Sequence, residues 1–420
     1  MVEEAAAPTV ELLPIGRWSE VLTQIQARIS PRFARAEVRE RVGRYLFGLL
    51  DRVERKNGWQ LAEGIGETGP QGVQRLLNAA VWDADGVRDD LRGYVVDALG
   101  DLASGMLIVD ETGFLKKGTH SYGVARQYTG TAGTTSNAQV GVFLAYASAK
   151  GAAFIDRALY LPRSWTRDPQ RRTEAGIPKG TRFATKLTLA QRMLARAFAA
   201  HVPARWVTAD SGYGRSHAFR RWLETRDQAY AVMIPKTTAV EYEGCRERAE
   251  QLGERLPEEA WVTVSTGENG HVTPAHQWVC LPLSEPCAPG RRRWLLIRRL
   301  REDPSDLAYY LAYYLAYYLA YYLAYYLAYY LAYYLAYGPA EISVQELVQV
   351  CDRRWAIEEG FAEAKGEVGL DQYEVRTWTA WRRFMTLGLL AHAALVVLRL
   401  RAMSSEAPTQ KGALHQPAHR

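Results

Sequence analysis

The chain has 420 residues, of which 48% are hydrophobic and 23% are charged, and its formal net charge is +6. These fractions are those of a folded globular protein and exclude an intrinsically disordered chain. The length predicts two or three domains, and the positive charge suits a partner with a phosphate backbone without proving one.

The first part of the chain, residues 1–100, is predicted to form a helical domain. Residues 36–50 place apolar side chains at helical spacing, a glycine-rich break covers 64–70, a second helix covers 73–80 and a third begins near Asp85. A helix, a glycine-bearing turn and a second helix are compatible with DNA binding through a recognition helix. Plain helical packing explains the same pattern, so both interpretations stay open.

The next part, residues 101–235, alternates predicted strands with predicted helices. Asp110 and Asp210 each follow a short apolar run, so both are expected at the carboxyl ends of neighbouring strands, where ligand sites of such sheets form. The predicted elements are strands at 106–110, 141–147, 154–161, 206–210 and 230–234, helices at 187–201 and 216–225, and a turn within 128–137.

A β-rich insertion is predicted for residues 236–338, and it ends in a tandem repeat of Leu-Ala-Tyr-Tyr over 307–337. Because four is a multiple of two, whole repeat units preserve the face that each strand residue presents. Any copy could therefore fill one strand, and the register is left open. A helix is the competing state for the extra copies, and an uncharged Leu/Tyr strand is an aggregation hazard.

Helices are predicted to return in residues 339–402, followed by a disordered tail at 403–420. One helix around residue 358 carries Arg354, Glu358 and Lys365 at i, i+4 and i+11, which places all three along one stripe. The apolar run that ends at residue 398 is predicted to be a buried helix, since it is too short to span a membrane.

Three carboxylates stand out chemically: Asp110, Asp210 and Glu358. Taken singly, an Asp after a strand is usually a turn former and a Glu on a helix usually faces solvent. Together they suit a site for divalent cations, which prefer oxygen ligands and clamp the attacking and leaving oxygens of a phosphoryl transfer. Without cations the three charges would repel one another, and one or more would tend to protonate.

Several longer motifs carry a resemblance to a known family. The chain resembles DDE transposases of the insertion sequence 701 family, within the wider group that has ribonuclease-H-like catalytic cores. Related transposases carry a Tyr-x2-Arg-x3-Glu-x6-Lys signature, which Arg354, Glu358 and Lys365 match, whereas Cys351 stands at the Tyr position. The resemblance spans nearly the whole chain and rests on residues 56–63, 82–94, 110–118, 123–128, 159–165 and 369–376.

The resemblance implies an α/β ribonuclease-H-like core with a β-rich insertion and an N-terminal helical domain that binds transposon ends. It implies that Asp110, Asp210 and Glu358 hold two Mg²⁺ ions, with Mn²⁺ as a substitute, for DNA cleavage and strand transfer. The implied partners are the terminal inverted repeats, the target DNA and a second copy of the chain, with no membrane. The implied location is the bacterial cytoplasm, at the nucleoid. Predicted DNA contacts are Arg354 and Lys365, together with Lys116, Lys117 and Arg126, which are equally plausible as ordinary surface charges.

Three alternatives remain open at this level. The expanded repeat lies only about twenty residues before Glu358, so a misplaced strand could misalign the third carboxylate and leave a DNA-binding relic without catalysis. A self-associating protein driven by the tyrosine repeat is a second alternative. An ordinary hydrolytic nuclease is the third, because carboxylates alone do not separate hydrolysis from strand transfer.

Overall fold

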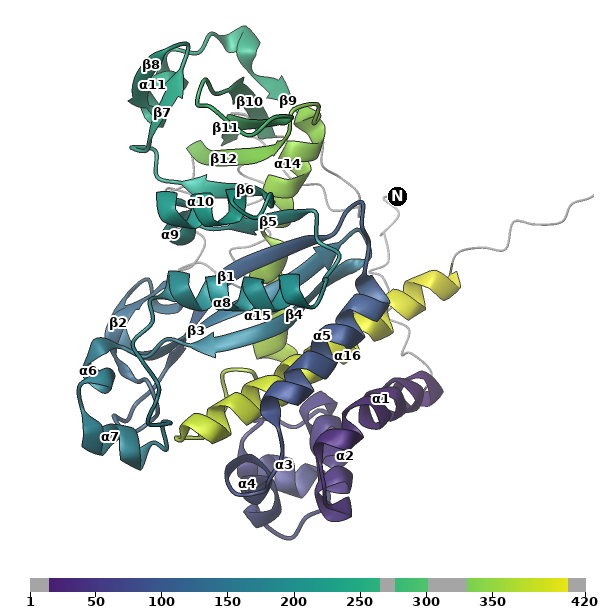
Figure 1. Cartoon of the computed structure of the whole chain (residues 1–420). Helices are drawn as coiled ribbons and strands as arrows, with labels where there is room; N and C mark the ends of the chain where they lie inside the picture. The colour runs from purple at the N-terminus through teal and green to yellow at the C-terminus, as the bar shows by residue number, and fades with distance from the viewer. Residues whose placement is uncertain (1–14, 265–275, 301–330, 407–420) are drawn as a thin grey trace, which may run out of the picture.

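The structure is a computed structural model that describes residues 15–264, 276–300 and 331–406. A long twisted sheet runs through the molecule, and helices cover both of its faces (Figure 1). The N-terminal helices lie at one end, and the strands that follow residue 235 lie at the other. The mixed α/β architecture predicted from the sequence is confirmed in this coarse form.

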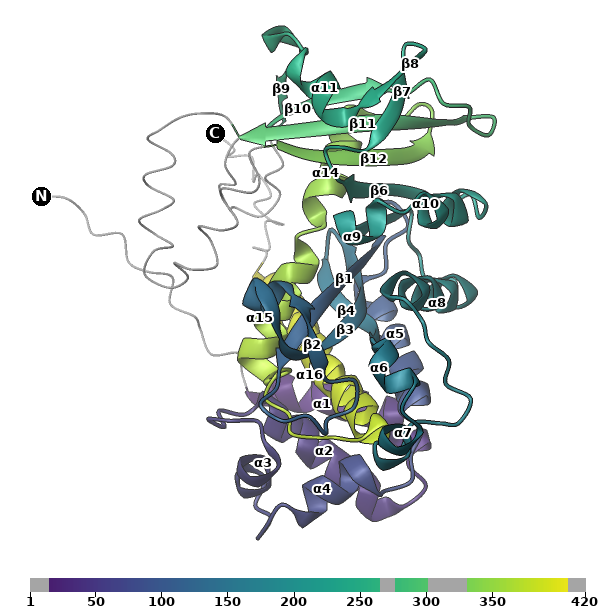
Figure 2. The ribbon, with the colours of Figure 1, turned by 90° about the vertical axis from the view of Figure 1, so that its left-hand side faces the viewer.

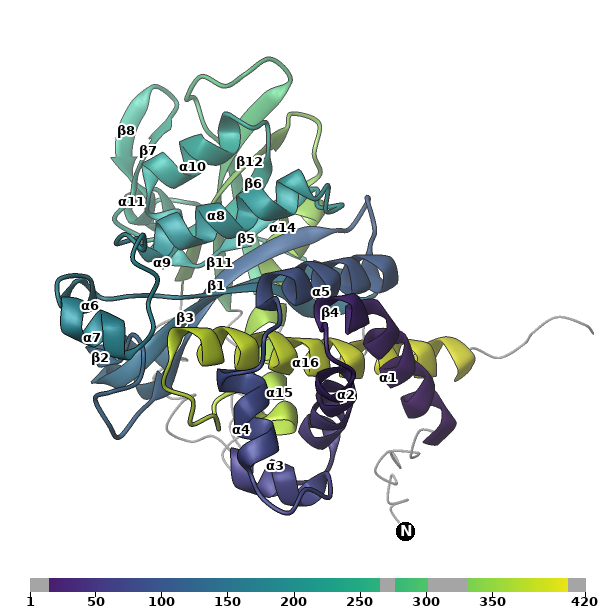
Figure 3. The same cartoon turned by 60° about the horizontal axis from the view of Figure 1, so that its bottom comes forward.

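Five helices form the N-terminal region, in agreement with the prediction of a mostly helical segment. The predicted break at residues 64–70 separates α3 from α4, and Asn57 caps α3 by accepting hydrogen bonds from the backbone of Trp59 and Gln60. Helices α1, α2 and α4 pack against the C-terminal helix α16 (Figure 3). The bounds are α1 Ile15–Ile29, α2 Ala36–Leu50, α3 Gly58–Gly64, α4 Gln71–Asn78, α5 Ala84–Leu99 and α16 Trp378–Glu406.

Ten strands of the described chain form one sheet, in the order β2-β3-β1-β5-β6-β12-β11-β10-β9, with β4 beside β3. Strands β1, β5 and β6 are parallel neighbours, and the other pairs are antiparallel. The strands are β1 Met106–Leu115, β2 Ala125–Thr129, β3 Thr134–Ser148, β4 Gly151–Leu159, β5 Trp206–Ala209, β6 Ala229–Ile234, β9 Val262–Thr263, β10 His276–Pro282, β11 Arg291–Leu300 and β12 Leu331–Pro339. A separate hairpin pairs β7 Ala239–Tyr242 with β8 Cys245–Arg248.

Helices from different parts of the chain cover the two faces of the core strands. Helix α8 lies on one side of β1, β3 and β4, and α15 lies on the other (Figure 2). This division matters for the site, because successive residues of a strand point to opposite faces. The remaining helices are α6 Arg163–Thr166, α7 Pro169–Glu174, α8 Lys186–Ala199, α9 Ser211–Gly214, α10 His217–Glu224, α11 Ala249–Glu254, α14 Val344–Arg353 and α15 Ala356–Val368.

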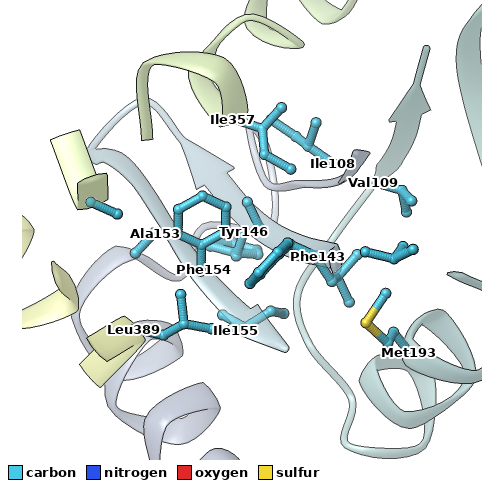
Figure 4. Packing of buried hydrophobic residues seen from close by; sticks show 14 of the residues in the cluster. Ile108, Val109, Phe143, Tyr146, Ala153, Phe154, Ile155, Met193, Ile357 and Leu389 are labelled. Carbon is cyan, nitrogen blue, oxygen red and sulfur yellow. The ribbon is translucent and has the colours of Figure 1, made fainter. Parts of the chain in front are cut away.

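Aromatic side chains fill the centre of the core. The ring of Phe143 meets Phe154 at 5.7 Å and Phe361 at 5.3 Å between centroids, in edge-on contacts that add to the burial of apolar area. Ile357 of α15 and Met193 of α8 belong to the same buried cluster (Figure 4). Ile357 precedes Glu358, so this packing anchors the start of the helix that carries the third carboxylate.

Helix α16 is the one described helix that is long and apolar enough to cross a membrane, over Trp378–Met403. Within that helix, 83% of the most apolar window is buried inside the protein, so it is a core helix. The prediction of a buried helix is confirmed. The predicted length was too short, because polar residues that flank the apolar run extend the same helix in both directions.

The final copies of the tyrosine repeat form β12, a central strand between β6 and β11. Leu331–Tyr337 supplies the strand, and every residue from Ala332 to Tyr337 is buried. Residues 307–330 lie outside the described residues. A Cβ at Gly338 would lie 2.8 Å from the Trp206 ring. If the repeat shifted by one four-residue unit along β12, Tyr334 would take the place of Gly338 and its side chain would clash with that ring. Gly338 therefore selects one of the registers that the sequence pattern leaves open.

Two sequence-based expectations differ from the structure near the carboxylates. Strand β1 does not end at Asp110 but continues to Leu115, because its partner β3 runs on beside it. The helix predicted around Glu358 is broken at Arg354 and Trp355, which separate α14 from α15. Both differences arise from tertiary contacts that a local pattern does not contain.

Candidate active site

The two apolar runs form neighbouring strands, as predicted, with Asp110 inside β1 and Asp210 directly after β5. Strands β1 and β5 pair in parallel as far as Val109 and Ala209, so the two aspartates are the next residues along each strand. Asp110 is buried. Its Oδ1 accepts a hydrogen bond from the backbone of Glu111 at 2.7 Å, which leaves Oδ2 for other partners.

The turn after β5 shapes the second aspartate. Asp210 is the N-cap of α9, and its Oδ1 accepts hydrogen bonds from the backbone N–H groups of Gly212 at 2.9 Å and Tyr213 at 3.3 Å. A Cβ at Gly214 would lie 1.9 Å from the carbonyl oxygen of Met233, so only glycine lets α9 pack this closely on β6. The Asp-Ser-Gly-Tyr-Gly motif is thus a device that orients the Asp210 carboxylate.

Glu358 reaches the site from the first turn of α15. The break before that helix places Arg354 between two of the carboxylates. Its Nη2 lies 2.9 Å from Glu358 Oε1, and its Nη1 lies 3.7 Å from Asp110 Oδ2. The predicted grouping of Arg354 with Glu358 is confirmed as a contact, although the two residues do not share one continuous helix.

The charges of the three carboxylates influence one another's pKa values. Burial raises the pKa of Asp110 well above its usual value, and the charges of Asp210 and Glu358 add to the rise while Arg354 opposes it. Burial also raises the pKa of Asp210, followed by the charge of Glu111. For Glu358, burial raises the pKa, whereas Arg354 lowers it. Clustered carboxylates with raised pKa values are typical of functional sites.

The donor set fits hard divalent cations, but the side chains are not closed around one. Within the described ranges, no three His, Cys, Asp or Glu side chains are grouped tightly enough to hold a metal ion. The reason is visible in the geometry: the guanidinium of Arg354 contacts both Asp110 and Glu358, and Asp210 is turned to its own backbone amides. The three carboxylates share the positive charge of Arg354, and further positive charge would relieve their repulsion.

Lys365 lies beside the site on the same face as Asp110. Its Nζ donates a hydrogen bond of 2.8 Å to Thr112 Oγ1, two residues beyond Asp110 on β1. Burial lowers the pKa of Lys365. The structure thus brings Arg354 and Lys365 to the carboxylates, as their positions in the sequence suggest.

The other predicted DNA contacts are further away along the strands. Lys116 donates a hydrogen bond of 2.9 Å to the backbone oxygen of Tyr373 and lies 3.5 Å from the centroid of its ring. Burial lowers the pKa of Lys116 to about 8, so this geometry does not support a phosphate contact for it. Lys117 and Arg126 are exposed, and their contacts with DNA stay predictions.

The arginines of β11 serve the fold. Arg291 pairs with Asp227, Arg293 with Glu224 at 2.7 Å, and Arg298 with Asp352 at 3.5 Å. The last pair ties β11 to α14. These paired arginines are therefore poor candidates for phosphate contacts.

Cys351, at the position of the signature tyrosine, is buried in α14. Burial raises the pKa of its thiol well above the usual value, so it is a poor nucleophile. Trp278 and Trp294 are also buried, so they are core aromatics and do not offer a surface for base stacking.

Sequence reasoning missed two residues of the site, Glu111 and Tyr213. Tyr213 Oη donates a hydrogen bond of 2.9 Å to Glu111 Oε2, and Lys186 forms an ion pair with Glu111 Oε1. Glu111 directly follows Asp110, and Tyr213 lies within the Ser-Gly-Tyr-Gly motif after Asp210. The sequence signal that could have identified both residues is their position beside Asp110 and within the motif that follows Asp210.

Comparison with known families decides the relationship of the chain. Residues 28–260, more than half of the chain, match the family described as DDE superfamily endonuclease. The chain belongs to the DDE superfamily. Residues 184–394 of this DDE protein also match the transposase DDE domain, a range that contains Asp210 and Glu358.

One relative of this DDE protein is a probable transposase for insertion sequence element IS701 from Microchaete diplosiphon. The two sequences are 29% identical over 196 residues, which are 46% of this chain and 48% of the relative. The match thus spans about half the length of that curated protein. The predicted relationship to DDE transposases is confirmed by the two family matches, and the similarity to this relative agrees with the predicted resemblance to the insertion sequence 701 family.

Proposed function

We propose that this protein is a transposase that cuts DNA at the ends of its element and joins those ends to target DNA. The observation that carries the proposal is the convergence of Asp110, Asp210 and Glu358 around Arg354, in a chain that belongs to the DDE superfamily. The three side chains come from β1, the turn after β5 and the start of α15. They would hold two Mg²⁺ ions, with Mn²⁺ as a substitute.

The order of the core strands supports a ribonuclease-H-like core. Three antiparallel strands, β4, β3 and β1, are followed by the parallel strands β5 and β6. Helix α8 connects β4 to β5 across one face of the sheet. Asp110 and Asp210 lie where the first parallel pair ends, which is a position where open sheets form ligand sites.

The proposed reaction has two phosphoryl transfers. In the first, water adds to the phosphorus at the element end and the P–O3′ bond breaks, which releases a 3′-hydroxyl and leaves a 5′-phosphate. In the second, that 3′-hydroxyl attacks a target phosphorus, a new P–O bond forms and the target's own 3′-oxygen leaves. Bound Mg²⁺ would supply charge neutralisation and lower the pKa of the attacking group. Asp110, Asp210 and Glu358 would hold the ion beside the reacting phosphate.

Cationic side chains on the face of Asp110 would hold the DNA backbone. Arg354 and Lys365 are the nearest, and a guanidinium suits bidentate contacts with phosphate. Arg126 lies further along the same face. Arg126 pairs with Asn137 of β3, and Asp110 pairs with Phe143 of the same strand. These two β3 residues are an even number of positions apart, so they and their partners point to the same face of the sheet. A backbone track across β1, β3 and β2 follows from this arrangement.

The N-terminal helices are the proposed site for the terminal inverted repeats. A cleft of about 340 Å³ lies between α2 and α4, with Arg35, Arg41 and Arg75 in its lining. Arg41 is paired with Glu67 at 2.8 Å, and Arg35 is largely exposed. Because two element ends must be joined in one event, a homodimer on DNA is proposed. The proposed location is the bacterial nucleoid, where the DNA substrate lies.

Mg²⁺-dependent cleavage of DNA that carries the element's own ends tests the function. The purified protein is incubated with a labelled fragment containing one end and its flank, and products are resolved on a denaturing gel. Cuts at the junction of end and flank are expected with Mg²⁺, and their loss is expected with EDTA. Joined products with a supercoiled target separate a transposase from a hydrolytic nuclease. Binding of the ends without any cut under Mg²⁺ or Mn²⁺ would contradict the proposal.

The catalytically impaired relic is the second candidate, and one observation favours it. Tyr334 of the repeat is fully buried, and the charges of Arg298 and Arg354 lower its pKa while burial raises it. The repeat therefore reaches the neighbourhood of the catalytic arginine. A strand in the wrong register there would disturb the third carboxylate.

A further inference from the structure

A partly buried polar network lies behind the catalytic face, on the opposite side of β1. Asp110 and Thr112 contact Arg354 and Lys365 on the side of α15. Glu111 lies between them, and its carboxylate contacts residues from the other side, Tyr213 of α9 and Lys186 at the start of α8. This is the alternation expected of a strand. Glu111 therefore belongs to the support of the site and not to the carboxylate group itself.

Both oxygens of Glu111 are used by protein donors. Tyr213 Oη lies 2.9 Å from Oε2, and Lys186 Nζ pairs with Oε1. Tyr213 is 2% exposed, so its hydroxyl has no water to replace this bond.

The network reaches Asp210 through the backbone of the same tyrosine. The Tyr213 N–H donates to Asp210 Oδ1, while the Tyr213 hydroxyl is fixed to Glu111 on β1. One residue thus connects the second carboxylate with the residue that follows the first. Without the Tyr213 hydroxyl, the turn after β5 loses this side-chain hydrogen bond to β1.

We propose that Glu111, Tyr213 and Lys186 form a positioning device that fixes the orientation of Asp210 relative to Asp110 for divalent metal binding. The inference rests on the proposed function, because it assumes that those carboxylates hold the metal. Outer groups that orient metal ligands typically contribute about 10- to 100-fold in metal affinity or activity. In this proposal the three side chains act through Asp210, to which Tyr213 donates a backbone hydrogen bond, so they are positioning residues.

The test compares Tyr213→Phe with a matched variant, Tyr230→Phe. Tyr230 is equally buried, and its hydroxyl donates to Glu224 Oε1 at 2.7 Å, where Arg293 completes the ion pair as Lys186 does for Glu111. Both variants lose one buried phenol-carboxylate bond. Mn²⁺ binding is measured by titration calorimetry on the full chain, alongside kcat and KM for cleavage.

Tyr213→Phe is expected to weaken Mn²⁺ binding about tenfold and to lower kcat with KM for DNA unchanged. Tyr230→Phe is expected to bind Mn²⁺ as the parent protein does. Equal Mn²⁺ affinities in the two variants would overturn the inference while leaving the proposed function intact. A parent protein that does not bind Mn²⁺, or that binds it no more tightly than Glu358→Gln does, would contradict the proposed function itself. The inference would then fail as well.

Discussion

Asp110→Asn is expected to abolish cleavage and, at the same time, to stabilise the metal-free protein. Loss of a metal ligand removes several kcal/mol of transition-state stabilisation, so cleavage should fall by about a thousandfold or more. In EDTA at pH 7.5 the free energy of unfolding should rise by about 1 kcal/mol, because a buried carboxylate that repels Asp210 and Glu358 has become neutral. Cleavage assays and urea denaturation measure the two effects.

The gain in stability that we expect for Asp110→Asn should depend on pH in a defined direction. A carboxyl whose pKa is raised by folding binds its proton more tightly in the folded state, so it destabilises the protein once the pH exceeds the unfolded pKa. The advantage of Asp110→Asn should therefore shrink as the pH falls towards about 4, where the parent carboxyl is also neutral. A variant that is less stable than the parent at pH 7.5 would contradict this electrostatic account.

Asp156→Asn is the matched control. Asp156 is more deeply buried than Asp110, but it pairs with Arg196 at 2.8 Å on the opposite side of the core from α15. Removing its charge takes away the carboxylate partner of Arg196, which is partly exposed, so the free energy of unfolding should fall by about 1 to 3 kcal/mol. Stability should fall in this variant, whereas cleavage at a temperature where it remains folded should continue.

Deletion of residues 307–330 is expected to leave cleavage unchanged and to stabilise the protein slightly. The deletion removes six of the four-residue units and keeps Leu331–Tyr337, which is all that β12 takes from the repeat. Strands β11 and β12 pair from Arg299 and Leu331, so their connection shortens from 31 residues (300–330) to 7 (31 − 24). A shorter connection costs less entropy to close, by about 1 kcal/mol for this change.

A variant with 24 Gly and Ser residues in place of 307–330 keeps the length of the connection and separates length from repeat sequence. It should cut DNA at the parent rate and lack the gain in stability. Cleavage that appears only after the deletion would show that the expanded repeat impairs the enzyme, and it would favour the relic. Denaturant midpoints together with initial cleavage rates distinguish these results.

The sequence pattern predicts many individual helices and strands well, because these leave local signals. Helix α2 coincides with the segment predicted from helical spacing, and β5, β6, α8 and α10 lie within one or two residues of their predicted bounds. Asp110 and Asp210 are recognisable because each ends an apolar run in the sequence. The pairing of those runs as neighbouring parallel strands then brings the two side chains together.

What the pattern misses depends on contacts between distant segments. The break at Arg354 places its guanidinium between Glu358 and Asp110, which lies 244 residues earlier in the chain (354 − 110). Lys116 donates a hydrogen bond to the backbone oxygen of Tyr373, and Tyr213, in the turn after β5, donates one to Glu111. The repeat leaves the register of β12 open, and the approach of Gly338 to Trp206 selects it.

The location of bound metal tests the central claim most directly. Crystals of the full chain grown with Mn²⁺ are measured at a wavelength where manganese scatters anomalously. The account predicts a peak within about 2.2 Å of carboxylate oxygens from Asp110, Asp210 or Glu358, with Arg354 displaced from its present contact with Asp110. Saturating Mn²⁺ with no peak among these carboxylates, or a peak held by other residues alone, would contradict it.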